Sequence, residues 1–150
     1  MVVFMLVLTF IHLVINPAIN FSGDLALDLK DAMQVKLETQ KLAHAVSDAA
    51  FSGIDGKKSV WIFIPLSSEI ECKSAEKKFV FTTTIRQESN LCASKKCTGE
   101  ISVAMPAGVA IDCTNFGSIG KINGQSTPKA LISALRSKSG GETVNVWRSE

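Results

Sequence analysis

The sequence contains few of the residues that enzymes and metal sites use. It has no tyrosine and only two histidines, His12 and His44. Nucleophilic and acid–base catalysis need a base within hydrogen-bonding reach, and residues 57–150 contain no histidine to act as one. Phosphate-binding glycine loops and C-x-x-C zinc knuckles are also missing. We therefore predict that the protein is not an enzyme and that it binds no cofactor and no metal.

The N-terminal region lacks charge of either sign. No Asp, Glu, Lys or Arg occurs before Asp24, and thirteen of the first fifteen side chains are Val, Leu, Ile, Met or Phe. Their burial is worth on the order of 20–40 kcal/mol as an upper bound. As a helix, the uncharged stretch would measure about 35 Å, enough to cross a bilayer core of roughly 30 Å. The stretch lacks the basic region and cleavage site of a secretory signal, so we expect its burial in lipid or against a partner.

The remaining charge is divided unevenly along the chain. Residues 1–56 carry three lysines and six acids, whereas residues 57–150 carry thirteen bases and eight acids. The bases are not concentrated on one helix or stripe, as they are in proteins that bind nucleic acid. We predict no nucleic-acid partner. We also predict two regions: an N-terminal helix over residues 1–52 and a β-rich head over residues 57–150.

From Asp24 onward the apolar residues follow a helical period of about 100° per residue. The polar residues form one narrow sector, predicted to face water: Lys30, Gln34, Glu38, Lys41 and Asp48. Apolar residues fill both flanks of this sector, namely Leu25, Leu29, Ala32, Met33 and Leu37 on one side and Val35, Leu42, Val46 and Ala49 on the other. A helix packed on one side needs only about 100° of apolar surface, so we predict two sets of neighbours, the head and other subunits. We expect a bend at Pro17 and a helix end near Phe51, before Gly53.

After Lys57 the period changes to two, which is typical of strands. Strands are predicted over residues 59–65, 69–72, 78–86, 100–105, 109–113 and 143–147. The segment ALISALRS (130–137) fits a short helix or a strand, and we favour a strand that turns back at Gly140 and Gly141. The pair Asn123-Gly124 predicts a two-residue hairpin. The first strand, SVWIFIP, is apolar on both faces, so we predict that it is covered on both sides.

The four cysteines, Cys72, Cys92, Cys97 and Cys113, all lie after the apolar segment. A zinc site would have to be all-cysteine, because both histidines lie elsewhere, so disulfides are the favoured reading. Cys72 and Cys113 fall in phase with core-facing strand residues, which makes a bridge between them plausible. Cys92 and Cys97 flank ASKK and are close enough to staple that loop. Other pairings stay open, since four cysteines allow three connectivities.

The junction KLAHAVSDAAFSGIDGKKSVWIFIP passes from a helix through a glycine-containing turn into a strand that ends in proline. Together with the uncharged N-terminal region, it resembles the archaeal type IV pilin-like proteins, the class III signal peptide family. The resemblance implies an α+β fold, with a long N-terminal hydrophobic α-helix followed by a small antiparallel β-sandwich-like head. Two family features are not found: a short basic leader, and a Glu near the fifth position, where this chain has Met5.

In that family the N-terminal helix lies in the membrane before assembly and forms the filament core afterwards. The resemblance therefore implies a structural subunit of an extracellular archaeal type IV pilus-like filament for surface adhesion, a homo-oligomer built by the pilus assembly machinery. The alternatives are an archaellum subunit for motility and a membrane-anchored extracellular binding domain. The residues expected to assemble the filament core are Val2, Val3, Phe4, Leu6, Val7, Leu8, Phe10, Ile11, Leu13, Val14, Ile15, Leu25, Leu29, Met33, Leu42 and Val46.

Overall fold

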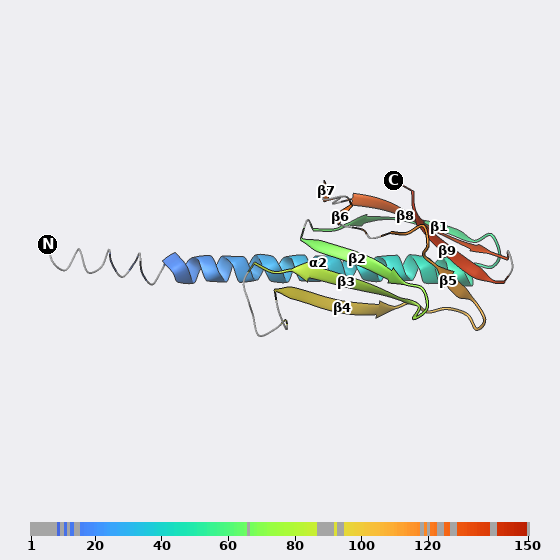
Figure 1. Ribbon diagram of the computed structural model, residues 1–150, viewed down its shortest axis with the longest axis horizontal. Coiled ribbons are helices and arrows are strands. Elements are labelled where there is room, and N and C mark those ends of the chain that lie inside the picture. Colours follow the sequence, from blue (N-terminus) through green and yellow to red (C-terminus); the bar gives the residue numbers. More distant parts are fainter. Residues whose placement is uncertain are drawn as a thin grey trace.

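The computed structural model describes residues 9, 11, 13, 16–65, 67–86, 92, 95–117, 119, 121–122, 125–126, 129–138 and 141–149. A helix, α2 (Asn16–Phe51), precedes the strands and runs along the long axis of the molecule (Figure 1). Its C-terminal part lies within the head, and its N-terminal part projects from the head. Pro17 occupies the first turn of α2, where its missing N–H is not needed. The bend expected there stays a prediction.

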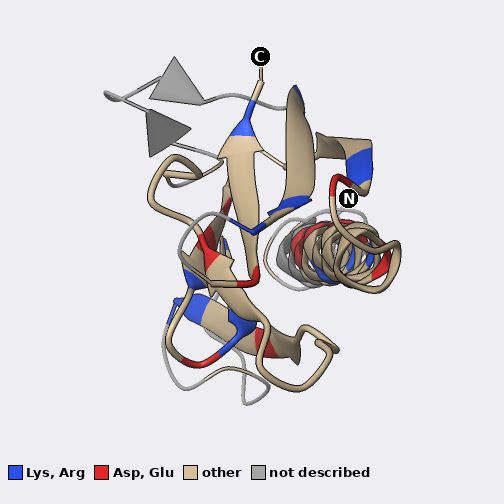
Figure 2. Cartoon of the chain, turned by 90° about the vertical axis from the view of Figure 1, so that its right-hand side faces the viewer, with Lys and Arg blue, Asp and Glu red and all other residues tan. Residues whose placement is uncertain are grey.

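Two sheets pack beside α2, as the view along the helix shows (Figure 2). The four-stranded sheet has the order β1-β8-β9-β5 and consists of β1 (Lys57–Phe63), β8 (Lys129–Ser137), β9 (Thr143–Arg148) and β5 (Ala110–Asp112). The three-stranded sheet consists of β2 (Ser68–Lys73), β3 (Lys78–Thr84) and β4 (Lys96–Ser102). A small pair is formed by β6 (Lys121–Ile122) and β7 (Gln125–Ser126). Strand neighbours are antiparallel except β5 and β9, which are parallel.

One hydrophobic core joins the helix to both sheets. Leu42 and Val46 of α2 are fully buried in the same cluster as Ile62 of β1 and Phe79 of β3. Both residues were predicted to assemble the filament core, but they are buried in the core of their own chain. The predicted alternation along β3 is confirmed, because Phe79, Phe81 and Thr83 are buried. The core therefore depends on the helix as much as on the sheets.

The helix ends where the sequence predicted. Gly53 has a φ of 87°, a left-handed conformation that favours glycine and ends helices. The following turn is tied to the sheet: the Asp55 N–H donates to the Arg136 carbonyl at 2.9 Å, and the Arg136 N–H donates to the Gly56 carbonyl at 3.1 Å. These bonds lead the chain directly into β1.

The strand predictions hold with shifted ends. The ambiguous segment is strand β8, and β9 returns antiparallel to it. The pairing of Lys121 with Ser126 confirms the predicted hairpin, although its central residues lie outside those described. The largest shift is in β4, which begins at Lys96 and pairs along all of β3. Its Gly99 lies opposite Phe81, and a Cβ there would stand 2.3 Å from the Phe81 ring, so the glycine makes room for this aromatic side chain.

The predicted fold class was wrong in its helical part. The chain is α+β, but α2 is not a hydrophobic helix, because Asp, Glu and Lys recur along it from Asp24 to Asp48. No helix in the described ranges combines the length and the apolar character needed to cross a membrane. The prediction extended the character of the charge-free N-terminal residues into one long helix. The sides of α2 have three different surroundings: one side packs in the head, one contacts the edge of β1, and one is uncovered.

Candidate functional site

Helix α2 leaves one apolar flank uncovered. Leu29 is 54% exposed, Met33 57% and Leu37 61%, although these side chains are entirely apolar. Steps of four residues place them in one line along the helix, and we call these three residues the open flank. Leu29 and Met33 belong to the set predicted to assemble the filament core. Leu42 and Val46, expected in the same assembly surface, are instead fully buried in the chain's own core.

Two hollows border the open flank. A groove of about 500 Å³ follows it on one side and is lined by Ala26, Leu29, Lys30, Met33, Gln34, Leu37 and Glu38. A hollow of about 260 Å³ lies on the other side, where the helix leaves the head, and is lined by Leu25, Asp28, Leu29, Ala32, Ile85, Cys92 and Cys97. Leu29 lines both hollows. Leu29 therefore stands between two depressions, whereas Met33 and Leu37 line the groove alone, a relief into which side chains of another helix fit.

The remaining assembly residues are placed as follows. Leu25 is half-buried beside the second hollow. Of the N-terminal set, Leu13 is 71% exposed and Ile11 is half-buried. The others lie outside the described residues: Val2, Val3, Phe4, Leu6, Val7, Leu8, Phe10, Val14 and Ile15.

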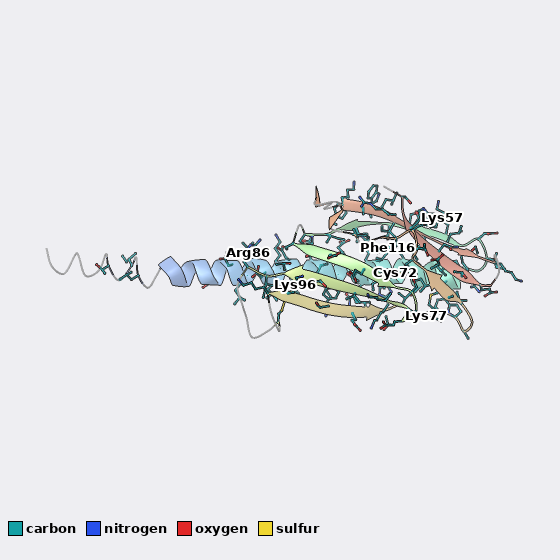
Figure 3. All side chains as sticks on the ribbon, viewed as in Figure 1. Lys57, Cys72, Lys77, Arg86, Lys96 and Phe116 are labelled. Carbon is teal, nitrogen blue, oxygen red and sulfur yellow. A yellow bond between two sulfur atoms is a disulfide. The ribbon has the colours of Figure 1, made fainter. Side chains whose placement is uncertain are left out.

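Asp28 fixes the helix at the point where it leaves the head. Its carboxylate is 5% exposed and accepts hydrogen bonds from the Arg86 backbone N–H at 2.8 Å and from the Arg86 guanidinium at 3.1 Å. Arg86 lies at the end of the head nearest the projecting helix (Figure 3) and also approaches Asp31 at 3.7 Å. The partner of Asp28 is thus an arginine of its own head, and this contact holds the open flank in place.

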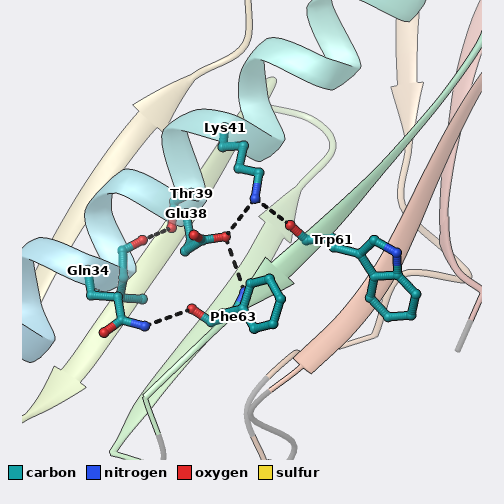
Figure 4. A network of polar contacts seen from close by, with 7 residues as sticks. Gln34, Glu38, Thr39, Lys41, Trp61 and Phe63 are labelled. Atoms are coloured by element: carbon teal, nitrogen blue, oxygen red, sulfur yellow. Dashed lines mark hydrogen bonds and ion pairs between the residues drawn. The ribbon is translucent and has the colours of Figure 1, made fainter.

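The polar sector of α2 seals the free edge of β1 (Figure 4). The Gln34 amide donates to the Phe63 carbonyl at 3.4 Å, the Phe63 N–H donates to the Glu38 carboxylate at 3.1 Å, and the Lys41 ammonium donates to the Trp61 carbonyl at 2.6 Å. β1 is the outermost strand of its sheet, and an unpaired edge invites association with other strands. Lys41 is exposed, as predicted for this sector, whereas Gln34 and Glu38 are half-buried. These hydrogen bonds block strand pairing at the β1 edge, so association through this edge is disfavoured.

The outward side of β1 is aromatic and uncovered. Ile62 and Ile64 are buried, whereas Trp61 is 37% and Phe63 45% exposed. The prediction that this strand is covered on both sides was therefore wrong within the described chain. Lys129 lies over both rings, with its ammonium 4.0 Å from the Trp61 ring centroid and 5.8 Å from that of Phe63. Such contacts are attractive because the ring face is negative.

Both predicted disulfides are present. Cys72–Cys113 links β2 to the residue after β5 across 41 positions, and Cys92–Cys97 closes a short loop beside the second hollow. Cys113 is buried and Cys72 packs against the core (Figure 3). Disulfides persist in oxidising compartments and are rare in reducing ones. The cysteines thus point to an oxidising environment for the head.

The described residues offer no metal centre, since no three His, Cys, Asp or Glu side chains among them gather into a group that could hold an ion. His44 is exposed on α2, and His12 lies outside the described residues. The absence of enzymatic activity and of a cofactor stays a prediction. Comparison with known proteins adds nothing to these assignments: no family model, no curated protein and no solved structure matches the chain.

Proposed function

We propose that this protein is a structural subunit of an extracellular filament, a pilin of an archaeal type IV pilus-like polymer that serves surface adhesion. The open flank carries the proposal. Three large apolar side chains stand in line on a helix whose other sides are occupied by the head and by the edge of β1. In the polymer, other copies of the chain cover this flank.

The open flank has enough apolar side chains to stabilise a contact between copies of the chain. Burying a side chain of this kind contributes roughly 1.5–3 kcal/mol, so each contact gains from several side chains at once. In the polymer the open flank of one copy packs against a different surface of the next, because a contact between different surfaces of identical subunits can repeat without closing. The edge of β1 is sealed, and in this proposal helix packing, and not strand pairing at β1, directs growth of the polymer.

The N-terminal sequence supports the same proposal. Its first 23 residues carry no charge, and burial against copies of itself is one way to keep such a sequence from water. Before assembly this segment lies in lipid, and the assembly machinery transfers it to the filament. Apolar surroundings are exchanged for apolar surroundings, so packing and shape determine the gain. The disulfides support a head on the oxidising side of the membrane.

The proposal is tested by microscopy of material sheared from cells that express the full chain. The wild type is expected in filaments, and Met33→Asp is expected to abolish them, because each contact would bury an unpaired carboxylate. Ile54→Asp is the matched control: Ile54 is 50% exposed but lies after the end of α2. Circular dichroism of each purified variant reports whether the head is folded.

Two outcomes contradict the proposal. Filaments of Met33→Asp as abundant as those of the wild type would show that the open flank is not an assembly contact. Recovery of the wild type only from the membrane fraction, with none in filaments, would favour the membrane-anchored binding domain.

A further inference from the structure

A second uncovered surface lies on the outward side of the four-stranded sheet, which we call the outer face. Both tryptophans of the chain point there, Trp61 from β1 and Trp147 from β9, since the residues that alternate with them, such as Ile62 and Val146, are buried. Trp147 pairs with Ser133, and Ser133 with Ser59, two residues before Trp61. Strand spacing and rise place the two tryptophan positions roughly 12 Å apart. The outer face therefore presents two large rings on one rigid sheet.

Serine hydroxyls lie between the two tryptophans. The Ser133 hydroxyl is within 2.9 Å of the Ser59 hydroxyl and within 2.9 Å of the Ser149 hydroxyl. Hydroxyls can both donate and accept hydrogen bonds. Ser133 is buried, so the exposed hydroxyls that a ligand between the rings would meet are those of Ser59 and Ser149.

Lysines bring positive charge to the same rings. Lys129 lies over Trp61 as described, and the Lys57 ammonium is 5.8 Å from the Trp147 ring centroid. Both lysines are exposed. A ligand on this face would meet a ring and an ammonium group at each of two places, which favours an anionic ligand with an apolar surface.

A hollow of about 200 Å³ adjoins Trp147 at the β5 side of the sheet. It is lined by Asp112, Asn115, Asn145, Val146, Trp147 and Arg148. The Thr114 hydroxyl and backbone N–H donate hydrogen bonds to Asp112 and hold the pKa of its carboxyl below the usual value. Asp112 is therefore an ionised acceptor at neutral pH. A ring, a carboxylate and two amides gathered in one hollow are a typical set for a small polar ligand.

We propose that the outer face binds an anionic polysaccharide. The C–H side of one sugar ring stacks on Trp147, and its hydroxyls hydrogen-bond to Asp112 and the amides in the hollow. The next sugars cross the serines toward Trp61, and their carboxylate or sulfate groups pair with Lys57 and Lys129. Sugars combine an apolar ring face with many hydroxyls, which is the combination that this surface offers.

The other polyanion, nucleic acid, fits less well. The two lysines at the rings do not form the continuous basic stripe that such ligands need, and no further lysine of the described chain lines the hollow beside Trp147. The inference deepens the adhesive part of the proposed function and rests on it for its biological setting. Binding is measured on the single chain, so it can fail while filaments form, and filaments can fail while it holds.

The experiment uses the full chain in detergent micelles and follows tryptophan fluorescence, which reports on this face because both tryptophans lie on it. The probes are oligogalacturonate, a neutral dextran oligosaccharide of equal length, and single-stranded DNA. We expect saturable binding of oligogalacturonate, and at least about tenfold weaker binding of dextran. Isothermal titration calorimetry then compares variants, with Trp147→Ala expected to weaken binding by about tenfold or more.

A second variant distinguishes a loss of binding from a loss of folding. Lys57→Gln changes an exposed side chain and is expected to weaken binding of oligogalacturonate, and to lessen its salt dependence, without a change in circular dichroism. Phe51→Ala, at the exposed end of α2, is the control that binds as the wild type does. No saturable binding of oligogalacturonate, unchanged binding in both Trp147→Ala and Lys57→Gln, or tighter binding of DNA would overturn the inference.

Discussion

The two apolar flanks of α2 have similar side chains and opposite surroundings. Leu42 and Val46 on one flank are fully buried by both sheets, whereas Leu29, Met33 and Leu37 on the other stand more than half exposed. The two flanks do not differ in hydrophobic character. They differ in whether other parts of the same chain cover them. The buried flank accounts for the fold of the head, and the open flank is left for a partner.

The largest expected effect comes from matched truncations on the two flanks. Leu42→Ala removes a fully buried side chain and is expected to lower the free energy of unfolding by about 2–5 kcal/mol. Leu37→Ala, at 61% exposure, is expected to change it by no more than about 0.5 kcal/mol. Denaturant unfolding of the full chain in detergent measures both. Equal decreases in the free energy of unfolding of the two variants would show that the open flank is covered within the chain. The proposed difference between the flanks would then be wrong.

Much of this comparison could be predicted from the sequence, because a helical period shows which residues share a side. It predicted that α2 would have two apolar flanks, and strand alternation predicted that Cys72 and Cys113 would meet. Periodicity describes one element at a time, and it could not show what each side meets. The Asp28–Arg86 contact joins residues 58 positions apart. The hydrogen bond from the Phe63 N–H to Glu38 depends on how the helix lies along β1. The outward rings of β1 looked like core for the same reason.

An intermediate effect is expected at the contact that holds the open flank in place. Arg86→Ala leaves the buried Asp28 carboxylate with the backbone N–H of residue 86 and without the guanidinium. We expect a loss of about 1–3 kcal/mol, below the value for a fully buried pair because the Arg86 side chain is 48% exposed.

Hydrogen exchange locates the loss from Arg86→Ala. Faster exchange is expected in α2 near Asp28 and the open flank, with little change near Leu42. Arg86→Lys keeps the charge without the forked geometry and is expected to lie between wild type and Arg86→Ala. Uniformly faster exchange along the whole helix would mean that the contact supports the entire head and is not a local anchor for the projecting part.

The smallest effect is expected from charges that lie on neither flank. On the three-stranded sheet Lys78 contacts Glu100 at 2.8 Å and also Glu76. Hydrogen bonding to Lys78 lowers the pKa of Glu76, and hydrogen bonding to Glu100 and Glu76 raises the pKa of Lys78. A lowered acid pKa stabilises the fold above the ordinary value near 4.5 and loses this contribution as pH falls through the folded-state pKa. A raised lysine pKa stabilises below the ordinary value near 10.5 and loses its contribution as pH rises through the folded-state pKa.

The melting temperature of the wild type should therefore exceed that of Lys78→Gln only between these limits, and by a small margin, because exposed ion pairs contribute little. High salt should remove the margin, since it screens exposed charges. The same salt should leave the difference between Leu42→Ala and Leu37→Ala in place, because apolar burial does not depend on charge screening. If salt instead reduced the Leu42→Ala difference as strongly as the Lys78→Gln margin, the two flanks of α2 would differ by electrostatic environment and not by coverage.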